Sequence, residues 1–334
     1  MKKKKREILM SKTPSSRSRL KIVIMEPLGI SEDAFKALTM LLKADGHQII
    51  AYADKAETKS ALIERVQDAD VIVLANQRLT QDVLQHCHHL KMVDVAFTGV
   101  DHVDVDYLKA NNVVICNAAN YSTHAVAELA IGLMIDLKRK ISECQKSLLC
   151  GESQFPTGSE LYHQTLGIIG TGTIGLQVAK IAKAFGIHLI AYSRTRKKEA
   201  LELGIQYVSL DQVMRQSDII SLHVPLTKQT VCMIDKNQIA KMKPNAILIN
   251  TARGSLVDYS ALTDALNEGR IAGAGIDVFE KEPPLPKDYP LFQAKNCIIT
   301  PHIAYATQEA LYKRAEIVFD NIRCWLEGHP QNMI

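Results

Sequence analysis

Short runs of β-branched and aliphatic residues alternate with helical stretches along almost the whole chain, and this order strongly limits the possible folds. The runs are continuously apolar, which is typical of parallel strands buried on both faces. Helical stretches between successive strands predict right-handed β-α-β crossovers in open, doubly wound sheets. We therefore predict an α/β fold with strands at 21–25, 71–74, 92–96, 113–116, 166–169, 188–192, 219–222, 246–250, 273–277 and 297–300.

Length and composition limit the class of protein. A chain of 334 residues predicts about two domains. No apolar run is long enough to span a membrane. The seven cysteines are odd in number, irregularly spaced and without a CxxC pair, which indicates reduced thiols and a cytoplasmic protein.

The positive charge is concentrated at the N-terminus. Residues 1–19 hold eight Lys and Arg and one Glu, whereas the remaining chain carries 32 basic and 35 acidic residues. A fold without a basic surplus does not favour nucleic-acid binding. We expect residues 1–19 to form a disordered basic tail, the alternative being a weak contact with an anionic surface.

Three further segments carry local predictions. The apolar periodicity of 122–140 is the longest helical signal in the sequence, and the polar, turn-rich segment 151–160 is the best candidate for a linker. The cluster His86-Cys87-His88-His89 lacks a second ligand pair at zinc-site spacing, so we expect no metal.

The strongest local motif is the glycine-rich loop Gly170-Thr171-Gly172-Thr173-Ile174-Gly175. A predicted strand precedes it and an amphipathic helix follows it, which is the context that dinucleotide binding requires. Gly170 would make the tight turn, Gly172 would let the backbone approach a pyrophosphate, and Gly175 would let helix and strand pack closely. A glycine-rich turn without a ligand is the alternative.

The end of the next strand bears on the choice of cofactor. NAD sites usually place an acid there for the ribose 2′-hydroxyl. Here the chain reads Ser193-Arg194-Thr195-Arg196, and the first acid is Glu199. Because Arg194 and Arg196 would attract a 2′-phosphate, the sequence favours NADP over NAD, unless they are merely solvated loop cations.

Three polar residues follow late strands, at the edge where open α/β sheets place their sites: Arg253, Glu282 and His302. Reduction of a 2-oxo acid needs a cation for the carboxylate and an acid to protonate the developing alkoxide. It also needs a carboxylate that keeps this acid protonated and oriented. Each residue alone has an ordinary structural explanation, but the three together downstream of a dinucleotide loop favour catalysis.

With these motifs the chain resembles the D-isomer-specific 2-hydroxyacid dehydrogenases from about residue 20 to residue 330. The blocks that carry the resemblance are 98–101 with Asp104, 125–128, 170–175, 223–227, 251–254 through Asp277 and 282–283, and 300–302. Segments 95–100 and 301–305 look most like glycerate dehydrogenase (hydroxypyruvate/glyoxylate reductase) and its relatives.

The resemblance implies two Rossmann-like, doubly wound parallel-sheet domains with the active site in a cleft between them. Residues 20–118 and 304–334 would form the substrate domain, and 119–303 the nucleotide-binding domain. It also implies a homodimer formed through the region of helix 122–140.

Roles follow from the same resemblance. Arg253 would bind substrate, and Glu282 would pair with His302, the acid/base. The substrate residues would be Asn76, Phe97, Thr98, Gly99, Val100 and Arg253. The cofactor residues would be Gly170, Gly172, Thr173, Ile174, Gly175, Ser193, Arg194, Thr195, His223, Val224, Pro225, Thr230, Thr251, Ala252, Asp277 and His302.

Departures from the family pattern also matter. Ser193 replaces the usual strand-end acid, and Ala304-Tyr305 follows the catalytic histidine where Gly-Gly or Gly-Trp is common. The pocket loops show no evident cluster of Arg and Lys for a substrate phosphate, so we expect a small unphosphorylated 2-oxo acid; Arg78 is the one residue that could bind such a phosphate. The alternatives are a dinucleotide-sensing corepressor on the same fold and, less favoured, a formate-type dehydrogenase, which would need Gln in place of Glu282.

Overall fold

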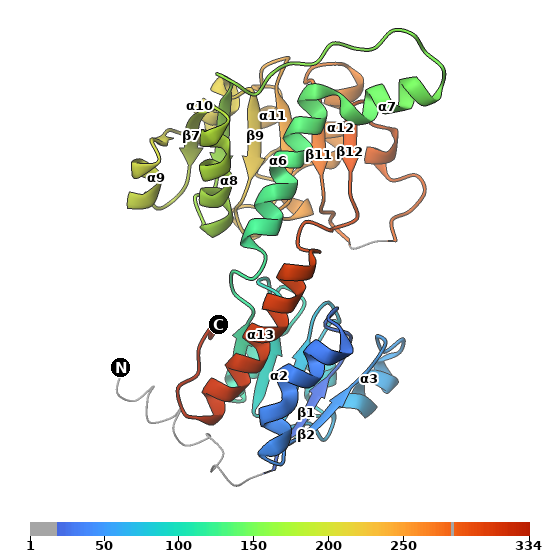
Figure 1. Ribbon diagram of the computed structural model, residues 1–334, viewed down its shortest axis with the longest axis vertical. Coiled ribbons are helices and arrows are strands. Elements are labelled where there is room, and N and C mark those ends of the chain that lie inside the picture. The colour runs from blue at the N-terminus through green and yellow to red at the C-terminus, as the bar shows by residue number, and fades with distance from the viewer. Residues whose placement is uncertain (1–18, 282–283) are drawn as a thin grey trace. The chain divides into compact units, whose positions relative to one another are not determined.

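The computed structural model describes residues 19–281 and 284–334, and these form two compact units (Figure 1). Unit 1 comprises the chain up to Ser122 together with Thr307–Ile334, and unit 2 comprises Thr123–Ala306. The predicted basic tail lies outside the described residues except for Arg19, as does Glu282. The expected boundaries after residue 118 and before residue 304 fall close to these.

Unit 1 is built on a five-stranded parallel sheet in the order β2-β1-β3-β4-β5. Its strands are β1 (Lys21–Ile24), β2 (Gln48–Ala51), β3 (Val71–Leu74), β4 (Met92–Val95) and β5 (Val114–Asn117). Its helices are α2 (Glu32–Ala44), α3 (Lys59–Val66), α4 (Gln81–Leu84), α5 (Val105–Ala110) and α13 (Gln308–Leu326). Each strand-to-strand crossover carries one of the first four helices, as parallel pairing requires.

Unit 2 is built on a seven-stranded parallel sheet in the order β12-β11-β10-β9-β6-β7-β8. Its strands are β6 (Thr165–Ile169), β7 (His188–Tyr192), β8 (Gln206–Tyr207), β9 (Ile219–Leu222), β10 (Ile247–Asn250), β11 (Gly273–Ile276) and β12 (Cys297–Ile299). The strand order reverses direction between β6 and β9, and such a switch point is where open α/β sheets bind ligands.

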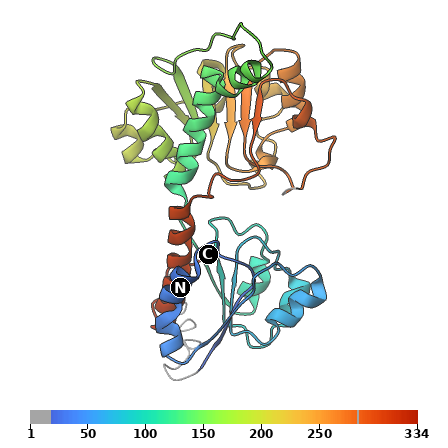
Figure 2. The same cartoon turned by 45° about the vertical axis from the view of Figure 1, so that its right-hand side comes forward.

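The helices of unit 2 cover both faces of this sheet (Figure 2). They are α6 (Thr123–Arg139), α7 (Ile141–Leu149), α8 (Thr173–Ala184), α9 (Lys198–Glu202), α10 (Leu210–Gln216), α11 (Lys236–Ile239) and α12 (Tyr259–Asn267), with short 3-10 helices η1 (Gly254–Leu256) and η2 (Pro290–Gln293). The expected α/β class with two parallel sheets is therefore confirmed. No helix in 19–281 or 284–334 has the length and apolarity to cross a membrane.

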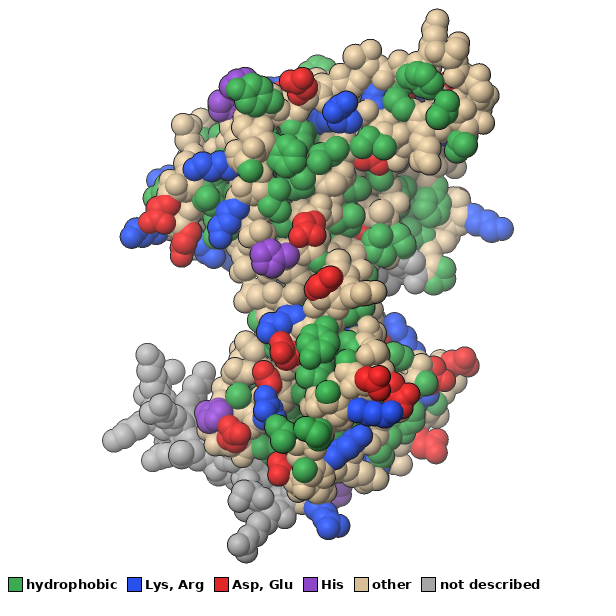
Figure 3. All heavy atoms as spheres, in the orientation of Figure 1, with side chains coloured by type: hydrophobic (Ala, Val, Ile, Leu, Met, Phe, Trp, Pro, Cys, Tyr) green, Lys and Arg blue, Asp and Glu red, His purple; other side chains and the backbone are tan. Residues whose placement is uncertain are grey.

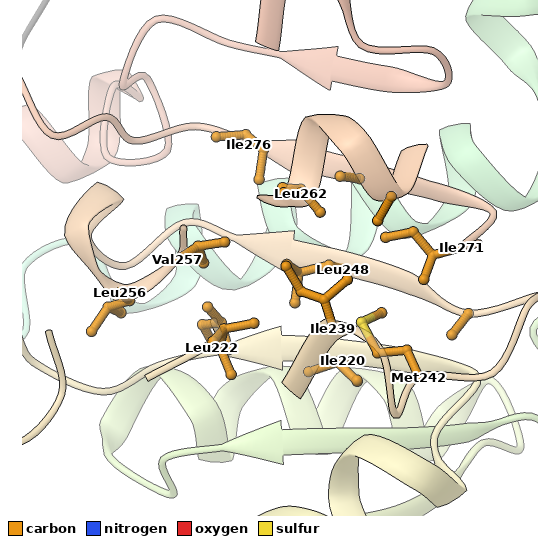
Figure 4. Packing of buried hydrophobic residues seen from close by; sticks show 14 of the residues in the cluster. Ile220, Leu222, Ile239, Met242, Leu248, Leu256, Val257, Leu262, Ile271 and Ile276 are labelled. Carbon is orange, nitrogen blue, oxygen red and sulfur yellow. The ribbon is translucent and has the colours of Figure 1, made fainter. Parts of the chain in front are cut away.

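The core of unit 2 lies between its sheet and these helices. Ile220, Leu248 and Ile276, from three neighbouring strands, are fully buried against Leu262 of α12 and Ile239 of α11 (Figure 4). Truncating one such side chain costs about 2–5 kcal/mol of stability, because lost burial adds to the cavity left behind. This packing fixes the carboxyl ends of the strands, from which the site loops emerge.

Two expectations need correction. Segment 151–160 does not link the units, because it lies wholly within unit 2. It follows α7 and leads back to the end of α6, where the Ser159 N–H donates to the Lys138 carbonyl at 2.7 Å. Strands β2 and β8 were not expected. Both are edge strands. β8 is only two residues long, and β2 has an apolar run, Ile49 to Ala51, but no residue that is buried as in a central strand.

Candidate functional site

The glycine-rich loop joins β6 to α8 at the switch point. Gly170 has φ of 102°, and a Cβ there would lie 2.6 Å from the His223 carbonyl oxygen, so only glycine fits. A Cβ on Gly172 would meet nothing within 4 Å. Gly172 is also the N-cap of α8 and offers no side chain to the helix. The free N–H groups and positive dipole end of α8 therefore face open space, which suits a phosphate.

A buried hydroxyl at the same edge of the sheet also fits a bound dinucleotide. Thr251, which follows β10, is 7% exposed, and its Oγ1 has no hydrogen-bond partner among the described residues. A buried polar atom of this kind usually has a partner, and a ligand would supply one. Together with the open space at Gly172, Thr251 indicates that this edge of unit 2 can hold NAD(P).

The basic loop after β7 is anchored to the glycine-rich loop by Tyr207, a residue that sequence reasoning missed. The Tyr207 hydroxyl lies 2.9 Å from Thr171 Oγ1 and accepts the Lys197 N–H at 3.1 Å. The Arg196 guanidinium lies 5.8 Å from the Tyr207 ring centroid. Arg194 and Arg196 are exposed on a loop at the carboxyl end of the strand beside β6.

The loop after β9 approaches the glycine-rich loop from the other side. His223 is partly buried, its Nε2 lies 2.9 Å from Ser221 Oγ, and desolvation lowers its pKa to about 4, so the ring is neutral at neutral pH. Pro225 begins a turn closed by Thr230, whose hydroxyl donates to the Pro225 carbonyl at 2.8 Å. Thr230 thus shapes the loop that carries His223 and Val224.

Arg253 is held by a buried network around Asn250. The Asn250 amide donates to the Arg253 carbonyl at 2.9 Å and to the Tyr259 hydroxyl at 3.0 Å, and it accepts the Ala252 N–H at 3.1 Å. Tyr259 in turn donates to the Val278 carbonyl. At Gly254 the chain passes so close to the backbone of Phe279 that any Cβ would overlap it. The backbone at Arg253 is therefore fixed from both sides.

His302 lies on a tight loop organised by Asp277. The fully buried Asp277 carboxylate accepts hydrogen bonds from the Thr300 hydroxyl at 2.6 Å and from the N–H groups of Ile303 and Ala304, both at 2.8 Å. Burial raises the pKa of Asp277, and these three hydrogen bonds oppose that rise. His302 itself has φ of 56°, a conformation that an L-residue keeps only when its surroundings impose it.

The aromatic ring of Tyr305 meets His302 edge-on, with ring centroids 5.7 Å apart. The departure from the family pattern noted at this position therefore lies directly against the expected acid. Its expected partner Glu282 lies outside the described residues, so the pairing of the two remains a prediction.

The substrate residues of unit 1 follow its strands at their carboxyl ends. Asn76 lies in a loop fixed by Glu26, whose Oε1 accepts the N–H groups of Ala75 at 2.9 Å and Gln77 at 2.6 Å. Glu26 is 3% exposed and was not singled out from the sequence, because a carboxylate after a strand carries no signal of this role.

The loop 97–100 directly follows β4 and is tied to the residues after β5. The Asn117 amide donates to the Thr98 carbonyl at 2.7 Å, and the Ala118 N–H donates to the Phe97 carbonyl at 3.2 Å. Of the loop's residues, Thr98 is exposed, and Phe97, Gly99 and Val100 are partly exposed. The loop is thus accessible to a small ligand while its base is fixed.

In unit 2 the expected cofactor residues, together with Arg253 and His302, lie on loops at one edge of one sheet. Loops after β6, β7, β9, β10, β11 and β12 all emerge there. A doubly wound sheet with a glycine-rich loop, an anchored arginine and a strained histidine on this edge defines a dinucleotide-dependent α/β enzyme.

Comparison with known proteins narrows this class. Residues 131–304 match the model of the D-isomer specific 2-hydroxyacid dehydrogenase, NAD binding domain. A glyoxylate reductase of Thermococcus litoralis is 40% identical over 84% of this chain and 88% of its own length. The chain belongs to the D-isomer specific 2-hydroxyacid dehydrogenase family, a family of NAD(P)-dependent oxidoreductases, which confirms the assignment made from the sequence.

Two further similarities extend the range of relatives. A D-3-phosphoglycerate dehydrogenase of Methanocaldococcus jannaschii is 42% identical over 92% of this chain, which spans only 58% of that relative. The solved structure of an acyclic imino acid reductase in complex with NADPH and D-Arg is 30% identical, with a TM-score of 0.85 over 94% of this chain and 100% of that one.

Proposed function

We propose that this protein is an NAD(P)-dependent D-2-hydroxyacid dehydrogenase that reduces a small 2-oxo acid such as glyoxylate or hydroxypyruvate. The observation that carries the proposal is the His302 loop. Asp277 uses both carboxylate oxygens to hold His302 in a left-handed backbone conformation, at the same sheet edge as the dinucleotide cradle. Strain of this kind is typical of a group that chemistry needs in one place.

The proposed reaction converts the 2-oxo acid, a reduced nicotinamide and one proton into the 2-hydroxy acid and the oxidised nicotinamide. The bound cofactor supplies the hydride for C2. Arg253 binds the substrate and polarises its ketone, while His302 donates the proton to the developing alkoxide. Glu282 would keep His302 protonated, and Asn76 with the backbone of Phe97–Val100 would hold the substrate carboxylate.

The cofactor preference that we propose is NADP over NAD. Its support is the exposed pair Arg194 and Arg196, on a loop that Tyr207 joins to the glycine-rich loop, and the lack of an acid at Ser193. A guanidinium binds a phosphate through charge and paired N–H groups, whereas a carboxylate at this position would repel it. The similar imino acid reductase was solved with NADPH.

We further propose that the protein is a homodimer formed through α6 and α7. No residue of α7 is buried, even though the helix carries large apolar side chains: Leu148 is 64% exposed and Leu149 is 79% exposed. Figure 3 shows hydrophobic side chains gathered at the surface over α6 and α7. An exposed apolar helix of this kind is typical of an interface.

All seven cysteines are free, which supports the proposed cytoplasmic location.

An initial-rate panel tests the proposed reaction. Purified protein is mixed with NADPH or NADH and with glyoxylate, hydroxypyruvate, pyruvate or phenylpyruvate, and the loss of reduced nicotinamide is followed. We expect the fastest loss with NADPH and glyoxylate or hydroxypyruvate. Tight cofactor binding without turnover of any acid would contradict the proposal and favour a dinucleotide-sensing protein.

A further inference from the structure

Unit 1 contains a buried cation that the proposed reaction does not use. Arg314 lies on α13, which packs against α2 and β4 (Figure 1), and it is only 3% exposed. Arginine is almost never buried to this extent unless it is paired, because its charge loses the solvation of water. A buried guanidinium therefore indicates a specific task.

The contacts of Arg314 connect three loops of unit 1. Its Nη2 donates to the carbonyl of Leu28, after β1, at 2.6 Å. Its guanidinium carbon lies 4.8 Å from the ring centroid of Phe97, after β4, and 6.0 Å from that of Tyr121. The rings of Phe97 and Tyr121 also meet edge-on at 6.0 Å. These cation–π and aromatic contacts fix the side chain of Phe97.

Phe97 is the first residue of the loop to which we assign the substrate carboxylate. Thr98 and Gly99 follow it, and their backbone conformation depends on where Phe97 is held. The charge of Arg314 also acts directly. A buried cation beneath an anion-binding loop attracts the anion more strongly than a solvated one, since little water lies between the two charges to screen them.

We propose that Arg314 is a positioning residue for the substrate anion: it holds the 97–100 loop through Phe97 and contributes a fixed positive charge behind it. This inference rests on the proposed function. It does not assign Arg314 to the chemical step, so the Michaelis constant for the 2-oxo acid should depend on it, whereas kcat should not.

Arg65 offers a matched control in the same unit. It is also a largely buried arginine, it stacks 4.2 Å from the Tyr52 ring centroid, and it donates to the carbonyl of Met25 at the end of β1. Unlike Arg314, it lies on α3 and has no described contact with Phe97. A general loss of packing in unit 1 should therefore appear in both variants.

The test compares Arg314→Met, Arg314→Lys and Arg65→Met with the wild type on the 2-oxo acid that the wild type reduces fastest. We expect Arg314→Met to raise the KM for the acid about tenfold or more, with kcat within about threefold and the KM for the cofactor within about twofold. Arg314→Lys keeps the charge and loses the planar stacking, so its KM for the acid should lie between those of the wild type and Arg314→Met. Arg65→Met should leave the KM for the acid within about twofold.

A KM for the acid within twofold of wild type in Arg314→Met, or an equal rise in Arg65→Met, would overturn the inference. The affinity of the protein–NADPH complex for oxalate, followed by cofactor fluorescence, gives a readout that needs no turnover. If the wild type binds oxalate but reduces no acid, the proposed function fails, while the effect of Arg314→Met on oxalate affinity still decides the role of Arg314.

Discussion

Asp94 is the clearest case of a single residue whose environment sets its chemistry. It lies in the middle of β4 and is fully buried. Its Oδ1 accepts the Asn321 amide at 3.2 Å, and its Oδ2 has no partner among the described residues. Burial raises its pKa well above the ordinary value, because the ionised form has lost its water.

This raised pKa predicts a pH-dependent stability. The folded protein favours the protonated form of Asp94. The stability that this residue contributes is therefore fully present below the pKa of Asp94 in the unfolded chain, and it is lost as the pH rises through the higher pKa of Asp94 in the folded protein. The amide introduced by Asp94→Asn does not titrate. We therefore expect the melting temperature of this variant, relative to wild type, to be higher at pH 8 than at pH 5. Glu64→Gln, at an exposed carboxylate on α3, is the control. An Asp94→Asn difference that does not change with pH would contradict this account.

Other residue roles had no sequence signal. A tyrosine on a two-residue edge strand, an asparagine at a strand end and an arginine in a helix are common residues in common places. Tyr207, Asn250 and Arg314 became visible only through the atoms they contact. The glycine-rich loop and the His and Arg that follow strands could be found from the sequence, because their residue types and spacing indicate a function.

At the scale of elements, the sequence predicted the central strands and the edge strands β5 and β12, but not the edge strands β2 and β8. A strand covered on both faces is usually continuously apolar. The missed strand β8 is two residues long and begins with Gln206, and β2 begins with Gln48 and has no buried residue. The prediction that the turn-rich segment 151–160 links the two units was wrong because it rested on composition alone. Composition shows that a segment is a loop, but only packing shows that it stays within unit 2.

The loop between β7 and α9 carries a prediction at this scale. Replacing both Arg194 and Arg196 by Ala should raise the KM for NADPH about tenfold or more and leave that for NADH within about twofold, since only NADPH carries the 2′-phosphate. Lys198→Ala is the matched control, because Lys198 is a neighbouring cation that pairs with Glu202 on α9 at 3.5 Å. Equal losses with both cofactors would assign the arginines to the loop's structure.

At the scale of the whole molecule, α7 carries the prediction on assembly. Changing both Leu148 and Leu149 to Glu should convert a dimer into a monomer, because two buried carboxylates per subunit would oppose an apolar interface. Size-exclusion chromatography with light scattering measures the mass directly. Leu201→Glu, at an apolar residue of α9 that is 56% exposed, should remain dimeric. A wild type that runs as a monomer would contradict the proposed assembly.

The central claim concerns the reaction, and the product tests it most directly. Hydroxypyruvate is reduced with NADPH by the wild type and by His302→Asn, and the glycerate is resolved by enantiomer. We predict one D-glycerate for each NADPH consumed. In His302→Asn we predict a rate lower by about 10²- to 10⁴-fold, with a far smaller loss of NADPH affinity. L-glycerate, or a His302→Asn rate close to that of the wild type, would contradict the account.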